Sequence, residues 1–145
     1  MSKTFTLSEA QTLLPVLESL LRRAQGSGTR VAEIEAGLER LRQKIFLSGG
    51  VHVDVTATAR RRAERDKALQ ETKDTLEEIA EIGVQVKDLD RGLLDFPCVV
   101  ERQAVLLCWK LGEAEIGYWH STDEGEAGRK PIDARFGRTE RSRPN

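Results

Sequence analysis

Hydrophobic residues recur every three or four positions through most of the first half of the chain, which is the spacing of an amphipathic helix. Glycines interrupt this pattern at Gly26–Gly28 and at Ser48–Gly50. The pattern therefore predicts helices over residues of about 7–25, 29–47 and 56–82. We expect the second and third helices to form a long antiparallel hairpin, because the second carries a coiled-coil-like apolar seam. That seam consists of Val31, Ile34, Leu38, Leu41 and Ile45.

Local signals mark the start of the first helix and the end of the second. Thr6 and Glu9 have the spacing of a capping box, in which each side chain accepts a hydrogen bond from the backbone of the other residue. Pro15 lies inside the helical pattern, so we expect the helix to kink or restart there. Val51–Val55 alternates strictly between apolar and polar residues, which predicts an extended linker before the third helix.

Short runs rich in β-branched and aromatic residues follow the helices and predict a small antiparallel β-meander. Three strands are expected, over residues of about 95–100, 104–111 and 114–121. Two-residue turns are expected between them, at Glu101–Arg102 and at Gly112–Glu113, where Gly112 can supply the positive φ that such turns need.

The two turns fix which side chains share a face of the sheet. Phe96 then pairs with Leu107 and Lys110 with Glu115, and alternate residues point to opposite faces. A core face collects Phe96, Cys98, Val105, Leu107, Trp109, Ile116, Tyr118 and, at its rim, His120. A mixed face collects Asp95, Pro97, Leu106, Cys108, Lys110, Glu115 and Trp119. Cys108 and His120 are thus expected on opposite faces, whereas a three-residue turn at Gly112 would bring them together.

Length and charge narrow the class of protein without naming a function. The chain has 145 residues and a formal net charge of −1, so no global field favours nucleic acid or a membrane surface. No apolar run approaches the roughly 20 residues needed to span a bilayer. The N-terminus has no hydrophobic signal segment, so we expect a cytoplasmic protein with reduced cysteines. We expect an α+β fold with a single domain over residues 1–132 and a mobile C-terminal tail over 133–145.

Several short motifs resemble those of a prokaryotic family known as domain of unknown function 2203. They include Gly92-Leu93-x-Asp95-Phe96-Pro97, Leu107-Cys108-Trp109-x-x-Gly112-Glu113, Trp119-His120 and Gly128-Arg129-x-Pro131-Ile132. The resemblance covers nearly the whole chain and implies a small single-domain protein of helices with a little sheet. It implies no activity. The polar members of the motifs and the adjacent tryptophan form the candidate functional cluster: Asp88, Asp95, Cys108, Glu113, Trp119, His120 and Arg129.

Two interpretations of function stay open. The favoured one is a binding or protein-interaction module that self-associates as a dimer, because Trp119 and Leu106 place an exposed apolar patch on the mixed face. The other is a small metal-dependent enzyme of hydrolase type. Its candidate residues are Asp95, Cys108, Glu113 and His120.

Metal and nucleic-acid binding each have a structural alternative. Cys108, Glu113 and His120 carry groups that bind divalent metal ions, but none has the sequence spacing of a zinc site, and a buried or rim position explains each as well. A basic run could contact phosphate, but acidic residues follow it closely, so a solvated helix end is favoured over weak nonspecific nucleic-acid binding. That run consists of Arg60, Arg61, Arg62 and Arg65.

Overall fold

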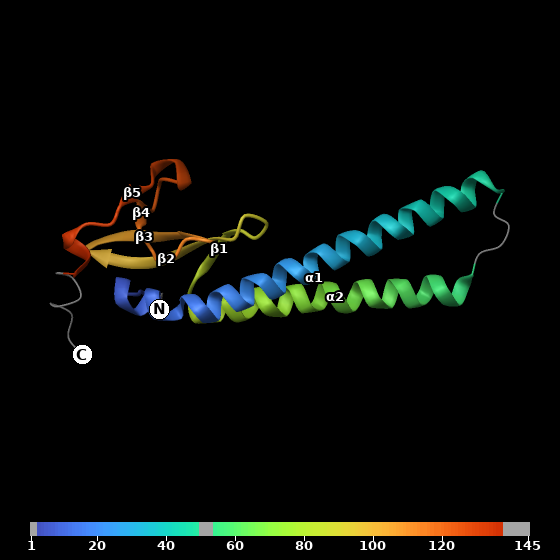
Figure 1. Ribbon diagram of the computed structural model, residues 1–145, viewed down its shortest axis with the longest axis horizontal. Helices are drawn as coiled ribbons and strands as arrows, with labels where there is room; N and C mark the ends of the chain where they lie inside the picture. Colours follow the sequence, from blue (N-terminus) through green and yellow to red (C-terminus); the bar gives the residue numbers. More distant parts are fainter. Residues whose placement is uncertain (1–2, 50–53, 138–145) are drawn as a thin grey trace. The chain divides into compact units, whose positions relative to one another are not determined.

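The computed structural model describes residues 3–49 and 54–137 (Figure 1). Two helices are followed by an antiparallel sheet of five strands in sequential order, rather than the three strands predicted. The helices are α1 (Leu7–Leu47) and α2 (Val55–Ile82). The strands are β1 (Gln85–Asp88), β2 (Leu93–Val100), β3 (Gln103–Lys110), β4 (Tyr118–Ser121) and β5 (Lys130–Pro131), and a 3-10 turn, η1 (Glu126–Gly128), precedes β5. The predicted α+β class is confirmed.

The chain forms two compact units. The sheet unit consists of Met1–Leu21 with Leu76–Asn145, and the helical unit is Arg22–Thr75. The sheet unit therefore holds every strand, the first turns of α1 and the end of α2. Within the ranges that the structure describes, neither helix is long and apolar enough to cross a membrane.

One helix replaces the two that were predicted before residue 50, because α1 continues through Gly26 and Gly28. The predicted break is wrong for a tertiary reason. Ser27 is buried between these glycines, and its hydroxyl lies 2.6 Å from the Thr72 hydroxyl of α2. This contact with α2 lies where the helix continues through two glycines, each of which costs roughly 1 kcal/mol relative to alanine.

Both helix starts follow from side-chain caps. The predicted capping box is confirmed: the Thr6 N–H donates to Glu9 Oε1 (2.8 Å), and the Glu9 N–H donates to Thr6 Oγ1 (3.1 Å). Pro15 lies inside α1 without ending it. Asp54 caps α2 by accepting from the Ala57 N–H (2.9 Å). The predicted extended linker lies outside the described residues except for its last two positions, and the second of these, Val55, already begins α2.

The first hairpin has the predicted register. Phe96 pairs with Leu107, and Val100 pairs with Gln103 across a two-residue turn. Glu101 and Arg102 both have positive φ, 50° and 66°, as a type I′ turn requires. The turn forms although neither residue is glycine or asparagine, because the paired strands on either side determine it.

The second hairpin differs from the prediction by one residue. Leu107 pairs with Trp119 and Leu106 with His120, so the predicted pairing of Lys110 with Glu115 is wrong. Because side chains alternate along a strand, this shift moves Trp119 to the core face and His120 to the face of Cys108.

Two hydrogen bonds within the turn and one to α1 hold residues 111–117 outside the β-ladder. The Lys110 N–H donates to Glu113 Oε1 (2.7 Å), and the Trp109 indole donates to the Glu113 carbonyl (3.0 Å). The Ile116 N–H donates to Gln11 Oε1 of α1 (2.6 Å). Backbone groups that the predicted strand would have paired are thus bonded elsewhere, and β4 begins only at Tyr118.

The core of the sheet unit lies between one face of the sheet and the two helices. Its buried members include Leu14, Leu17, Leu21, Ile79, Leu94, Phe96, Leu107 and Trp109. Phe136 also belongs to this core, and its ring lies 5.9 Å from that of Trp119. The predicted tail begins at residue 133, so it includes Phe136, and residues 138–145 lie outside the described residues.

Candidate metal centre

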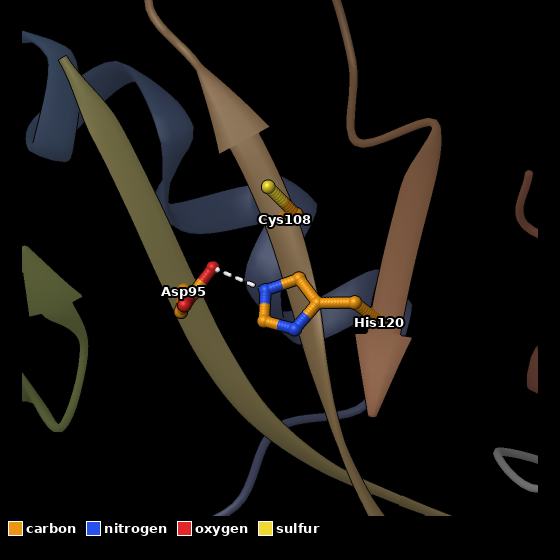
Figure 2. A group of neighbouring side chains, drawn as sticks. All are labelled: Asp95, Cys108 and His120. Carbon is orange, nitrogen blue, oxygen red and sulfur yellow. Dashed lines mark hydrogen bonds and ion pairs between the residues drawn. The ribbon is translucent and has the colours of Figure 1, made fainter. Parts of the chain in front are cut away.

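The face of the sheet opposite the core carries three side chains that can bind a metal ion (Figure 2). Asp95 of β2 pairs directly with Cys108 of β3, and His120 of β4 pairs with Leu106, two residues from Cys108. Cross-strand partners share a face, so three adjacent strands converge their side chains on one point. One ligand atom from each residue lies within 4.8 Å of the other two.

These three side chains are closed off from solvent. Asp95 and Cys108 are 0% exposed and His120 is 1% exposed. Arg129, directly after η1, contacts this face: its guanidinium lies 4.2 Å from the centre of the Tyr118 ring and donates to the Cys108 carbonyl oxygen at 3.5 Å. Arg91, in the β1–β2 turn, forms a 2.5 Å ion pair with Glu126 of η1. Water is thereby excluded from a cluster of ionisable groups, which strengthens every electrostatic interaction within it.

Hydrogen bonds fix the orientation of the His120 ring. Its Nδ1 lies 2.9 Å from the Ser121 carbonyl oxygen, and its Nε2 lies 3.1 Å from Asp95 Oδ1. A carbonyl oxygen can only accept a hydrogen bond, so His120 Nδ1 carries a hydrogen. Nε2 and the Asp95 carboxylate oxygen can both be acceptors, so their contact needs either a hydrogen or a cation between them. A histidine that donates one ring N–H to a backbone carbonyl and presents the other nitrogen is oriented as metal-binding histidines are.

Asp95 has a buried oxygen without a hydrogen bond. Oδ2 lacks any hydrogen-bond partner among the described residues, and it forms an ion pair with Lys87 Nζ at 3.8 Å. A buried carboxylate oxygen left in this state is costly, by about 1–3 kcal/mol or more for a charged group. A cation bound between the three side chains would remove that cost.

The Cys108 thiol is protonated at neutral pH. Burial raises its pKa to about 11, with a contribution from the Asp95 carboxylate, while Arg129 acts in the opposite direction. A protonated thiol is a poor nucleophile. Since His120 Nδ1 is bonded to a carbonyl as well, the cluster does not have the arrangement of a cysteine–histidine nucleophile pair.

The ligand types fit zinc, and the three donor atoms, which lie within 4.8 Å of one another, would move closer together around one ion. Thiolate, imidazole and carboxylate are all zinc ligands, and tetrahedral bond lengths place their donor atoms about 3.3–3.6 Å apart. The Nε2–Oδ1 separation of 3.1 Å is within a few tenths of an ångström of that range. Thiolate and carboxylate together also balance the charge of a divalent cation, so the buried site would be neutral.

The other members of the predicted cluster do not belong to the group formed by Asp95, Cys108 and His120. Glu113, which the sequence grouped with Cys108 and His120, instead pairs with Arg129 at 2.9 and 3.1 Å. Asp88 accepts from the Arg91 N–H (3.1 Å) in the β1–β2 turn. Trp119 lies on the opposite face, against the core.

Asp95 takes the place that the metal prediction gave to Glu113. The signal that could have found it is its direct pairing with Cys108, which the predicted first hairpin already contained.

The basic run lies on α2 in the helical unit. Its members are Arg60, Arg61, Arg62 and Arg65, and Arg65 pairs with Asp66 at 3.1 Å. Weak nucleic-acid binding by this run stays a prediction.

The fold and the site together define a small α+β protein with a buried aspartate–cysteine–histidine cluster on a five-stranded meander. The chain belongs to the family described as uncharacterized conserved protein (DUF2203), whose model matches residues 3–132. That range contains all three residues of the cluster, and the resemblance found in the sequence is confirmed. No curated protein and no solved structure matches the chain.

Proposed function

We propose that this protein binds one divalent transition-metal ion, with zinc as the best fit, through Asp95, Cys108 and His120. One observation carries the proposal: three buried ligand atoms of the types that zinc prefers lie within 4.8 Å of one another. The orientation of the His120 ring supports it, as does Asp95 Oδ2, which has a 3.8 Å ion pair with Lys87 but no hydrogen-bond partner among the described residues.

The alternative without a metal is a buried ion pair of His120 with Asp95, and Cys108 as a small apolar neighbour. That pair satisfies one oxygen of the carboxylate, and the other has an ion pair with Lys87 at 3.8 Å but no hydrogen-bond partner among the described residues. A bound ion would engage the carboxylate, the imidazole and the thiolate together. The metal-bound and metal-free states therefore differ in whether the carboxylate of Asp95 is bound to an ion.

The burial of the site favours ion binding over turnover. Three protein ligands leave a fourth position on zinc, which water or a substrate can occupy in an enzyme. A hydrolase needs a path by which substrate reaches that position, whereas all three side chains are buried. An ion that joins β2, β3 and β4 fits this geometry better than a catalytic one.

Metal analysis of the full chain, purified without a metal-affinity tag, tests the proposal. We expect about one zinc ion per chain after dialysis against zinc, and a thiolate-to-cobalt charge-transfer band after replacement by Co²⁺. Cys108→Ser, Asp95→Asn and His120→Gln should each lose most of the bound ion, and Cys108→Ser should also lose the band.

Cys98→Ser is the matched control, because Cys98 is a buried cysteine on the opposite face of the same sheet. It should retain both the ion and the band. Absence of bound zinc in the wild-type chain at millimolar free metal, or equal loss in the Cys98 and Cys108 variants, would rule the site out.

A further inference from the structure

We propose that two copies of this chain pair along the part of the helical unit that contains residues 35–45 of α1 and 58–65 of α2. The surface that the sequence offered for self-association, around Leu106 and Trp119, is unsuitable because Leu106 is buried and Trp119 packs on the core. The apolar seam of α1 offers another surface. Ile34 is buried, but Leu38 and Ile45, further along the seam, are only half-buried.

An open groove lies where the seam is half-buried. It has a volume of about 520 Å³, and its residues come from both helices of the helical unit. They are Glu35, Leu38, Glu39, Leu41, Arg42, Ile45, Thr58, Arg62 and Arg65. The Thr58 hydroxyl is buried there without a hydrogen-bond partner among the described residues. Phe46 and Leu47, directly after the groove on α1, are 83% and 84% exposed.

The charges of the groove point to a second copy as its occupant. The α1 edge carries Glu35 and Glu39, with Arg42 paired to Glu39, whereas the α2 edge carries Arg62 and Arg65, with Arg65 paired to Asp66. One edge is thus net acidic and the other basic. A two-fold interface must be complementary to itself, and a surface with opposite charges on its two edges meets that requirement.

The same charges select one of the two possible two-fold arrangements. With the axis parallel to the helices, α1 of one copy faces α2 of its partner at the same height, so the acidic edge meets the basic edge. With the axis across the helices, α1 faces α1 and acidic edges meet. The first arrangement is therefore the proposed one. It would join the two seams at Leu38, Leu41 and Ile45 into the core of a four-helix bundle.

Charge reversal tests this arrangement in the full chain. Glu35→Arg with Glu39→Arg reverses one edge, and Arg62→Glu with Arg65→Glu reverses the other. Sedimentation equilibrium should show a wild-type dimer, self-association at least about tenfold weaker in each double variant, and recovery when the two variants are mixed, because each reversed edge then meets an edge of opposite charge. Circular dichroism verifies that both variants keep their helices.

A second pair of variants applies if charge reversal unfolds the helices. Leu41→Asn, in the groove, should weaken self-association at least tenfold, and Val16→Asn, on an exposed position of α1 in the sheet unit, should leave it unchanged. A wild-type chain that stays monomeric at about millimolar concentration would overturn the proposal and leave the groove to a different partner. So would a mixture of the charge variants that associates no better than either variant alone, or an equal effect of Leu41→Asn and Val16→Asn. None of these measurements depends on bound metal.

Discussion

At the scale of single residues, a proton occupies a position where the proposed ion would bind. The Cys108 thiol holds its proton well above neutral pH, since burial raises its pKa to about 11. Metal binding must displace this proton, so the affinity for metal depends on pH.

The direction of that dependence follows from the thiol. Below its pKa the thiol must lose one proton for each ion bound, so metal affinity should rise about tenfold per pH unit from Cys108 alone between pH 6 and 8. Zinc titrations against a competing chelator at several pH values measure this slope. Cys108→Ser should lower the slope by about one, together with the affinity, and Cys98→Ser should leave it unchanged. A slope that is the same with and without the Cys108 thiol would show that this thiol is not a ligand.

At the scale of elements, α1 is continuous because its contacts with α2 outweigh two unfavourable glycines. A Cβ added to Gly26 or Gly28 would meet no atom within 4 Å, and neither residue has positive φ. The glycines are therefore not required by space or by backbone conformation. Gly49, just after α1, differs because its φ is +74°.

Alanine substitutions measure this difference. Gly26→Ala and Gly28→Ala should each raise the free energy of unfolding by about 0.5–1 kcal/mol, because alanine restricts the unfolded chain and fits the helix. Gly112→Ala should lower it, since its φ of +104° is strained for any residue with a Cβ. Urea denaturation followed by circular dichroism compares the three variants. Destabilisation by Gly26→Ala or Gly28→Ala would mean that these positions are packed more tightly than the structure indicates.

At the scale of the whole molecule, the chain places its chemistry and its proposed self-association in different units. The buried cluster belongs to the sheet unit, and the groove belongs to the helical unit. Both tryptophans, Trp109 and Trp119, also belong to the sheet unit, so their fluorescence reports on that unit.

Zinc should therefore stabilise the sheet unit, whose unfolding the tryptophan fluorescence detects. At a free concentration of 100 times Kd, an ion that binds only the folded state adds about 2.7 kcal/mol. We expect a higher midpoint of fluorescence-detected urea unfolding with zinc than with a chelator, and no such difference for His120→Gln. The same gain in the variant would place the bound zinc elsewhere.

Much of this protein was determined locally, and the sequence by itself was enough to predict it. The capping box of Thr6 and Glu9 depends on residues three apart, and the first hairpin depends on alternation around Glu101–Arg102. Helical periodicity and strand alternation gave the α+β class for the same reason: each is a property of neighbouring residues. The core position of Trp109 followed from that alternation.

Only the tertiary structure decided the features that depend on residues distant in the sequence. The contact of Ser27 with Thr72 makes one helix of two predicted ones. The bond from the Ile116 N–H to Gln11 and the ion pair of Glu113 with Arg129 accompany the shift of the second hairpin by one residue. The sequence offered Cys108 and His120 as candidate ligands but placed them on opposite faces. Because strand side chains alternate with a period of two, that single-residue shift is what brings His120 to Cys108 and Asp95.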